Sequence, residues 1–146
     1  MTKIKVYNAA KDEVESVETV EKSEAEWRRL LTPEQFDIAR HGGTEAAFSK
    51  TCPVPPNKAG VYQCVCCGTD LFRYEQKFES GTGWPSFVGP VSELNIKYFS
   101  DDSYGMARTE VRCARCGAHL GHVFDDGPPP SGKRYCINTV ALKLSA

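Results

Sequence analysis

The sequence predicts a mainly β domain of antiparallel strands, with two short helices near the N-terminus. Helix signals are confined to residues 23–43. From residue 44 onward, short runs of β-favouring residues are separated by Pro, Gly, Asn and Asp. Connections this short favour antiparallel pairing. A repeated cysteine pair further predicts a metal that joins distant strands.

The helical front begins after residues 1–22, which are polar and weakly patterned and are expected to be an extended or frayed lead-in. Two capping boxes, each a Ser or Thr followed three residues later by Glu or Gln, predict helix starts at Ser23 and Thr32. Pro33 suits the first turn of the second helix, and Gly42 suits its end.

Residues 44–146 form the predicted β body. Residues 49–60 contain three prolines and are expected to form a loop. No linker marks a second domain, and a length of 146 residues suits a single domain spanning residues 1–146. Strands are expected at residues 61–65, 71–74, 91–99, 105–112, 122–124 and 134–144.

Charge and composition exclude several classes of protein. Eighteen Lys and Arg against nineteen Asp and Glu give a net charge of -1, so a broad nucleic-acid-binding surface is not expected. No apolar run approaches the roughly 18 residues of a membrane span, and the N-terminus lacks a secretory pattern. A cytoplasmic protein is therefore expected, and its seven cysteines favour metal binding or catalysis over disulfides.

Two copies of the pattern C-x-x-C-G indicate a metal site. Cys64 and Cys67 form the first pair, and Cys113 and Cys116 form the second. The glycine after each pair, which can adopt a positive φ, identifies these four as ligands and leaves Cys66 outside the set. Four thiolates with no open position are typical of one structural Zn²⁺. Free thiols, a redox C-x-x-C pair and an iron site are the alternatives.

A reactive cysteine is predicted in the last strand. Period-2 alternation places Arg134, Cys136 and Asn138 on one face. A guanidinium beside the thiol favours thiolate, so a lowered pKa of Cys136 is expected. The alternative is a structural cysteine beside a solvated Arg and Asn.

Two further motifs suggest a reaction site. His119 and His122 follow the second cysteine pair and suit acid–base chemistry, although they could also be metal ligands or core residues. Trp84, between Gly83 and Pro85, could line a small apolar pocket or simply fill the core.

Taken together, these motifs resemble the B-type methionine sulfoxide reductases over residues 23–144. The resemblance implies two antiparallel sheets packed as a zinc-stapled β-tent. It also implies reduction of the R epimer of methionine sulfoxide, free or in oxidised proteins, with a thioredoxin-like reductant. The matching segments are residues 32–35 (TPEQ), 43–45 (GTE), 80–87 (SGTGWPSF), 113–127 (CARCGAHLGHVFDDG) and 134–138 (RYCIN).

The resemblance also implies a role for each site residue. Cys136 would be the nucleophile that becomes a sulfenic acid. His119 and His122 would hold or protonate the sulfoxide oxygen. Trp84 and Phe124 would bind the substrate, with Trp84 against its methyl group. The supporting residues would be Asp126, Arg134 and Asn138.

The chain departs from this pattern at Thr82, where many family members carry the recycling cysteine. Cys52 and Cys66 are then the remaining thiols, and Cys52, in the 49–60 loop, is the tentative resolving cysteine. Direct reduction of Cys136 by an external thiol is the alternative. The rival hypothesis for the whole chain is a non-catalytic, zinc-stapled binding module on the same fold.

Overall fold

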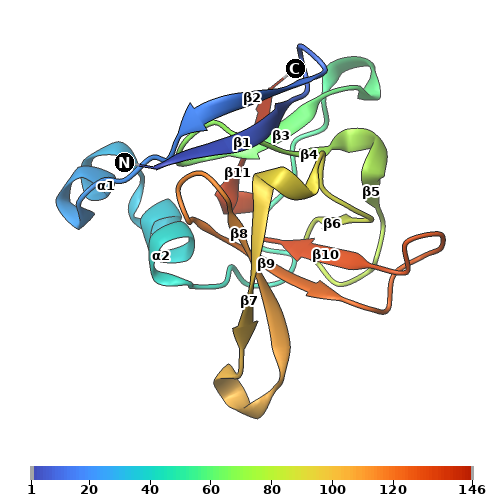
Figure 1. The fold of residues 1–146 in the computed structure, drawn as a ribbon. Helices are drawn as coiled ribbons and strands as arrows, with labels where there is room; N and C mark the ends of the chain where they lie inside the picture. The colour runs from blue at the N-terminus through green and yellow to red at the C-terminus, as the bar shows by residue number, and fades with distance from the viewer. Residues whose placement is uncertain (1, 146) are drawn as a thin grey trace.

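The computed structural model describes residues 2–145 and confirms a mainly β architecture with two N-terminal helices (Figure 1). Met1 and Ala146, the ends of the predicted domain, lie outside the described residues. The elements are β1 (Lys3–Asn8), β2 (Glu13–Glu18), α1 (Glu24–Leu30), α2 (Pro33–His41), β3 (Val61–Cys64), β4 (Asp70–Arg73), β5 (Lys77–Phe78), β6 (Ser86–Phe87), β7 (Ile96–Asp101), β8 (Arg108–Cys113), β9 (His119–Phe124), β10 (Arg134–Ile137) and β11 (Leu142–Ser145).

Two larger sheets, as predicted, form the body of the fold. One has the order β5-β6-β10-β9-β8-β7, and the other has the order β11-β3-β4. Every strand pairing in them is antiparallel. The β7–β8 hairpin extends away from the rest of the molecule (Figure 1).

Both helices begin at the predicted capping boxes. The Ser23 hydroxyl accepts the backbone N–H of Glu26, whose carboxylate returns to the backbone N–H of Ser23. Thr32 and Gln35 repeat the arrangement at the start of α2. Gly42 ends α2 with φ +71°, the left-handed conformation that glycine adopts without strain.

From residue 2 to residue 22 the lead-in expected to be extended or frayed is instead folded back on itself, because β1 and β2 pair as an antiparallel hairpin. The fully buried Asn95 carboxamide fixes this hairpin to the body. Its oxygen accepts the Tyr7 N–H at 2.8 Å, and its NH₂ donates to the carbonyls of Tyr7 and Asp70 at 3.0 and 2.7 Å. The hairpin is thus docked by hydrogen bonds from a polar side chain, whereas sequence analysis looks for an apolar pattern as the sign of docking.

The single strand expected over residues 134–144 is two strands in different sheets. The 3₁₀ turn Thr139–Ala141 separates β10 from β11 and carries the chain between them. Other strands also differ from expectation. Strand β9 begins at His119 rather than residue 122, β7 at Ile96 rather than residue 91, and β8 at Arg108 rather than residue 105. The short strands β5 and β6 were not expected.

The core lies beneath β10 and includes aromatic rings from both larger sheets. Phe72 and Phe87 stack with ring centroids 4.5 Å apart, and Tyr62 meets Phe87 edge-on at 5.6 Å. Tyr135 and Ile137 of β10 are buried, whereas Arg134 and Cys136 are partly exposed. The predicted alternation is therefore confirmed, and the core fixes the strand that carries the cysteine.

Within residues 2–145, no helix is long and apolar enough to cross a membrane.

Candidate functional site

Four cysteine sulfurs lie together and could hold a metal ion. The Sγ atoms of Cys64, Cys67, Cys113 and Cys116 all lie within 4.8 Å of one another. Two Sγ–Sγ distances, Cys64 to Cys116 and Cys67 to Cys113, are 3.6 Å. A tetrahedral Zn²⁺ with bonds of about 2.3 Å requires sulfurs roughly 3.8 Å apart. The arrangement therefore fits a Cys₄ zinc, and Cys66 is not a member of the group.

The two cysteine knuckles have the same backbone geometry. Gly68 and Gly117 adopt φ +78° and +77°, as the repeated glycine predicts. Each glycine N–H bonds to the carbonyl of the first cysteine of its pair at 2.9 Å. From α2, the guanidinium of Arg40 donates to the Cys116 sulfur at 3.6 Å. The knuckles are thus built for paired ligation, and Arg40 adds positive charge next to the thiolates.

A second feature is a pocket of about 200 Å³ over β9 and β10. Most of the predicted site residues line it: Trp84, His122, Phe124, Arg134, Cys136 and Asn138. Thr44, Thr82, Arg108, Gly121 and Ile137 complete the lining. The pocket therefore brings together residues from five separate parts of the chain.

Cys136 occupies the centre of β10, opposite His122 in the β9 register. Burial raises the pKa of the Cys136 thiol, and the charge of Arg134 and the hydrogen bond with Thr82 lower it by less. The expected lowering of this pKa was therefore wrong for the free protein. The strand pattern identified the guanidinium but gave no measure of the desolvation.

Arg134 is fixed beside the thiol by two other contacts. Its Nε and Nη2 donate to the two carboxylate oxygens of Asp126 at 2.9 and 3.2 Å. Its guanidinium also lies 4.5 Å from the ring centroid of Phe124. Asp126 itself is exposed and does not line the pocket, so it acts on the site through Arg134.

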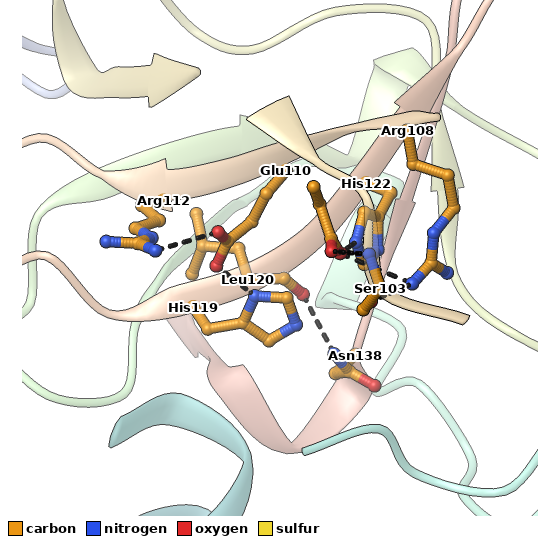
Figure 2. Close-up of polar contacts among 9 residues, drawn as sticks. Ser103, Arg108, Glu110, Arg112, His119, Leu120, His122 and Asn138 are labelled. Atoms are coloured by element: carbon orange, nitrogen blue, oxygen red, sulfur yellow. Dashed lines mark hydrogen bonds and ion pairs between the residues drawn. The ribbon is translucent and has the colours of Figure 1, made fainter. Parts of the chain in front are cut away.

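The two histidines occupy different positions. The imidazole of His122 lines the Cys136 pocket, with Nε2 at 2.7 Å from a carboxylate oxygen of Asp101. His119 is buried, with Nδ1 at 2.6 Å from Glu110. Among residues 2–145 no partner reaches its Nε2, which lies on the side of the ring that faces His122 and Asn138 (Figure 2). The ring centroids are 5.5 Å apart, so both can serve one site.

Asn138 and Trp84 are linked through the buried residue Glu45. The Asn138 carboxamide accepts the Glu45 N–H at 3.0 Å and donates to the Leu120 carbonyl at 3.1 Å. The Trp84 indole N–H donates to the Glu45 carbonyl at 2.9 Å. A carboxylate oxygen of Glu45 also accepts the Val140 N–H at 3.0 Å. Residue 45 therefore holds two pocket walls together.

Comparison with known proteins matches residues 31–146 to the SelR domain. The chain is similar to proteins named peptide methionine sulfoxide reductase MsrB. One from Methanosarcina barkeri is 55% identical over 125 residues, which is 86% of this chain and 87% of the relative. One from Synechococcus is 56% identical over 84% of this chain and 90% of the relative. One from Pseudomonas fluorescens is 52% identical over 88% of this chain and 97% of the relative.

The chain belongs to the MsrB family. The matched domain begins at residue 31, so the β1–β2 hairpin and α1 of this MsrB-family chain lie outside it.

Besides Glu45, three residues around the pocket and its histidines were not singled out from the sequence. Asp101 and Glu110 hold the histidines, and Arg108 lines the pocket. The sequence did hold a sign of Arg108 and Glu110, because charged residues recur at every second position, 108, 110 and 112, and so share one face of a strand. Asp101 gave no such signal, because its partner lies 21 residues away in the sequence.

Cys52 is partly buried in the 49–60 loop and packs against the core. Burial raises the pKa of its thiol, and a hydrogen bond with Tyr62 lowers it by less. No contact between Cys52 and Cys136 is seen within the described chain, so its recycling role stays a prediction that requires the loop to move.

Proposed function

We propose that this MsrB-family chain reduces methionine sulfoxide, peptide-bound or free, with Cys136 as the nucleophile. The observation that carries the proposal is the pocket in which Cys136, His122, Trp84 and Asn138 converge. A small cavity with aromatic walls, one thiol and one imidazole suits a methyl sulfoxide group. The resemblance of the motifs to the B-type enzymes favours the R epimer.

In the proposed reaction, the Cys136 thiolate attacks the sulfoxide sulfur while an imidazole supplies the proton that the oxygen needs in order to leave. The protonated oxygen then transfers from the methionine sulfur to the Cys136 sulfur as the transient bond between the two sulfurs breaks, so methionine departs as the thioether and Cys136 is left as a sulfenic acid. Two thiol equivalents then convert the sulfenic acid back to thiol and release water, while they are oxidised to a disulfide. Thioredoxin or a similar dithiol is the proposed reductant.

The other pocket residues have supporting roles in this proposal. Trp84 packs against the substrate methyl group, with Phe124 as a second apolar wall. Arg134, held by Asp126, favours the thiolate as the pocket closes around substrate. Asn138 orients the segment beside the thiol. For the first thiol equivalent we propose Cys52, with an external thiol as the alternative.

The four-cysteine group is proposed to bind one structural Zn²⁺. Cys64, Cys67, Cys113 and Cys116 would hold it, and the bound metal would supply folding energy rather than reaction chemistry. Cys64 pairs with Leu142, just beyond the turn that follows Asn138, so the cluster would also fix the position of β10.

The deciding experiment is turnover by Cys136→Ser with separated R and S sulfoxides of a blocked methionine and dithiothreitol as reductant. The wild-type protein should reduce the R epimer, and the variant should have no activity at unchanged metal content. Turnover that survives in Cys136→Ser would reject the nucleophile. Absence of wild-type turnover on both epimers would favour the non-catalytic binding module, which the names of the relatives argue against.

A further inference from the structure

Each histidine near the pocket is the end of a chain of Arg, carboxylate and imidazole (Figure 2). Arg112 donates to Glu110 at 2.9 Å, and Glu110 contacts His119. Arg108 donates to Asp101 at 3.3 Å, and Asp101 contacts His122. The two chains differ in one respect: Glu110 meets Nδ1 of its imidazole, whereas Asp101 meets Nε2.

The Asp101 carboxylate is held in place from three sides. Its oxygens accept from the Ser103 N–H at 3.0 Å, from Arg108 and from His122. The hydrogen bonds from Ser103 and His122 hold the pKa of this carboxyl well below its usual range. An ionised carboxylate has no proton to donate, so Nε2 of His122 must carry the hydrogen of their 2.7 Å contact.

We propose that Asp101 is a positioning residue, which holds the Nε2–H of His122 and leaves Nδ1 as the ring atom that gives its proton to the sulfoxide oxygen. The proposal rests on the reductase function proposed above. Arg108 and Ser103 hold Asp101 in place, so they act on His122 only through Asp101. His119, by the same reasoning, presents Nε2, because Glu110 takes its Nδ1–H.

The two imidazoles therefore have different tasks. Burial lowers the pKa of His119 more than Glu110 raises it, which favours a neutral ring that orients the oxygen or a water through Nε2. His122 lines the Cys136 pocket itself, whereas His119 does not. A carboxylate held against Nε2 stabilises its imidazolium form, which makes His122 the acid of the pair.

The pH test must take account of every charged or titratable group that faces His122. Asp101 comes from β7, and the others come from β8, β9 and β10. These are Arg108, Glu110, His119, Arg134 and Cys136. Of them only Asp101 contacts the His122 ring nitrogen, so an Asp101 variant changes the local charge without removing a pocket-lining side chain.

The experiment compares Asp101→Asn with Asp102→Asn, a matched change at the adjacent exposed carboxylate. Asp101→Asn removes the charged acceptor of the His122 Nε2–H and the negative charge beside the ring, so kcat should fall most at the alkaline end of its pH profile. Turnover at pH 8 should fall about tenfold or more, because a positioned proton donor contributes about 10²–10⁴-fold to a rate. Asp102→Asn should match the wild type.

The second measurement is the tautomer of His122, read by ¹⁵N NMR of the resting protein. The wild type should show Nε2–H, Asp101→Asn should show a mixture, and Glu110→Gln should leave His122 unchanged. A neutral wild-type His122 that carries its single hydrogen on Nδ1 instead of Nε2, or a pH profile of Asp101→Asn identical to that of Asp102→Asn, would overturn the proposal. The tautomer needs no turnover, so it remains a test even if the reductase function fails.

Discussion

Replacement of Asn138 by Ala should destabilise the protein and misplace Trp84, although the two side chains share no hydrogen bond. Both bond to the peptide groups of Glu45, a residue only 4% exposed. Without the Asn138 carboxamide, the Glu45 N–H loses its acceptor inside the protein. The Leu120 carbonyl keeps the backbone N–H of Asn138 at 2.9 Å, so it is not left unpaired.

The magnitude follows from that single unpaired donor. A buried N–H left without an acceptor costs about 1–3 kcal/mol. For a domain of this size, each kcal/mol lowers Tm by about 2–4 °C, so a fall of about 2–12 °C is expected. Trp84→Phe removes the indole N–H and leaves the Glu45 carbonyl unpaired, with a penalty of similar size. Urea unfolding of the metal-loaded protein measures both changes.

The double variant decides whether the linkage is real. If both side chains stabilise one conformation of Glu45, the second change should cost less than it does alone, with a coupling of at least about 0.5 kcal/mol. Turnover should follow the same pattern, with the double variant little worse than the worse single variant. Strictly additive free energies would refute the linkage and leave Asn138 and Trp84 as independent parts of the site.

Three other outcomes follow from the site. Cys113→Ser should bind well under one metal per chain, as elemental analysis would show, and should lose much of its fold, because ligation energy is folding energy; full metal content would contradict the assigned ligand set. Burial raises the pKa of Cys136, so its alkylation rate, read by peptide mass spectrometry, should rise about tenfold per pH unit and should not level off below about pH 9. Arg134→Gln should be alkylated more slowly at each pH. A plateau of the wild-type rate near pH 7 would contradict this. Cys52→Ser should slow turnover with thioredoxin but not with dithiothreitol, and one turnover without reductant should give a Cys52–Cys136 crosslink; equal thioredoxin rates would favour the external thiol.

The parts of the fold that follow local chemistry could be predicted from the sequence. Capping boxes at Ser23 and Thr32 depend only on neighbouring residues, and both helices begin there. The repeated glycine after each cysteine pair selects, by backbone geometry alone, the four cysteines whose sulfurs lie together. Alternation in β10 placed Arg134 beside Cys136 because strand parity is local as well.

The remaining features depend on contacts between distant residues. The β1–β2 hairpin buries Val6 but leaves Val14 exposed, so the short apolar alternation of β1 does not continue through β2. Asn95 docks the hairpin from far along the chain. The 134–144 segment looks continuous because the turn after Asn138 contains neither Gly nor Pro. The partners of His119 and His122 come from another hairpin, and the desolvation of Cys136 arises from the whole pocket.

Because the chain passes from one sheet to the other between β10 and β11, strands that are synthesised early must wait for partners that are synthesised late. Strand β3 emerges early, yet one of its two neighbours is β11, and β6 must wait for β10. Since ribosomes add only about 5–20 residues per second, the first cysteine pair spends seconds without its second pair or its sheet partners. During that interval the thiols of Cys64 and Cys67 are open to oxidation. The growing chain is then itself vulnerable to the oxidants whose damage the finished protein is proposed to reverse.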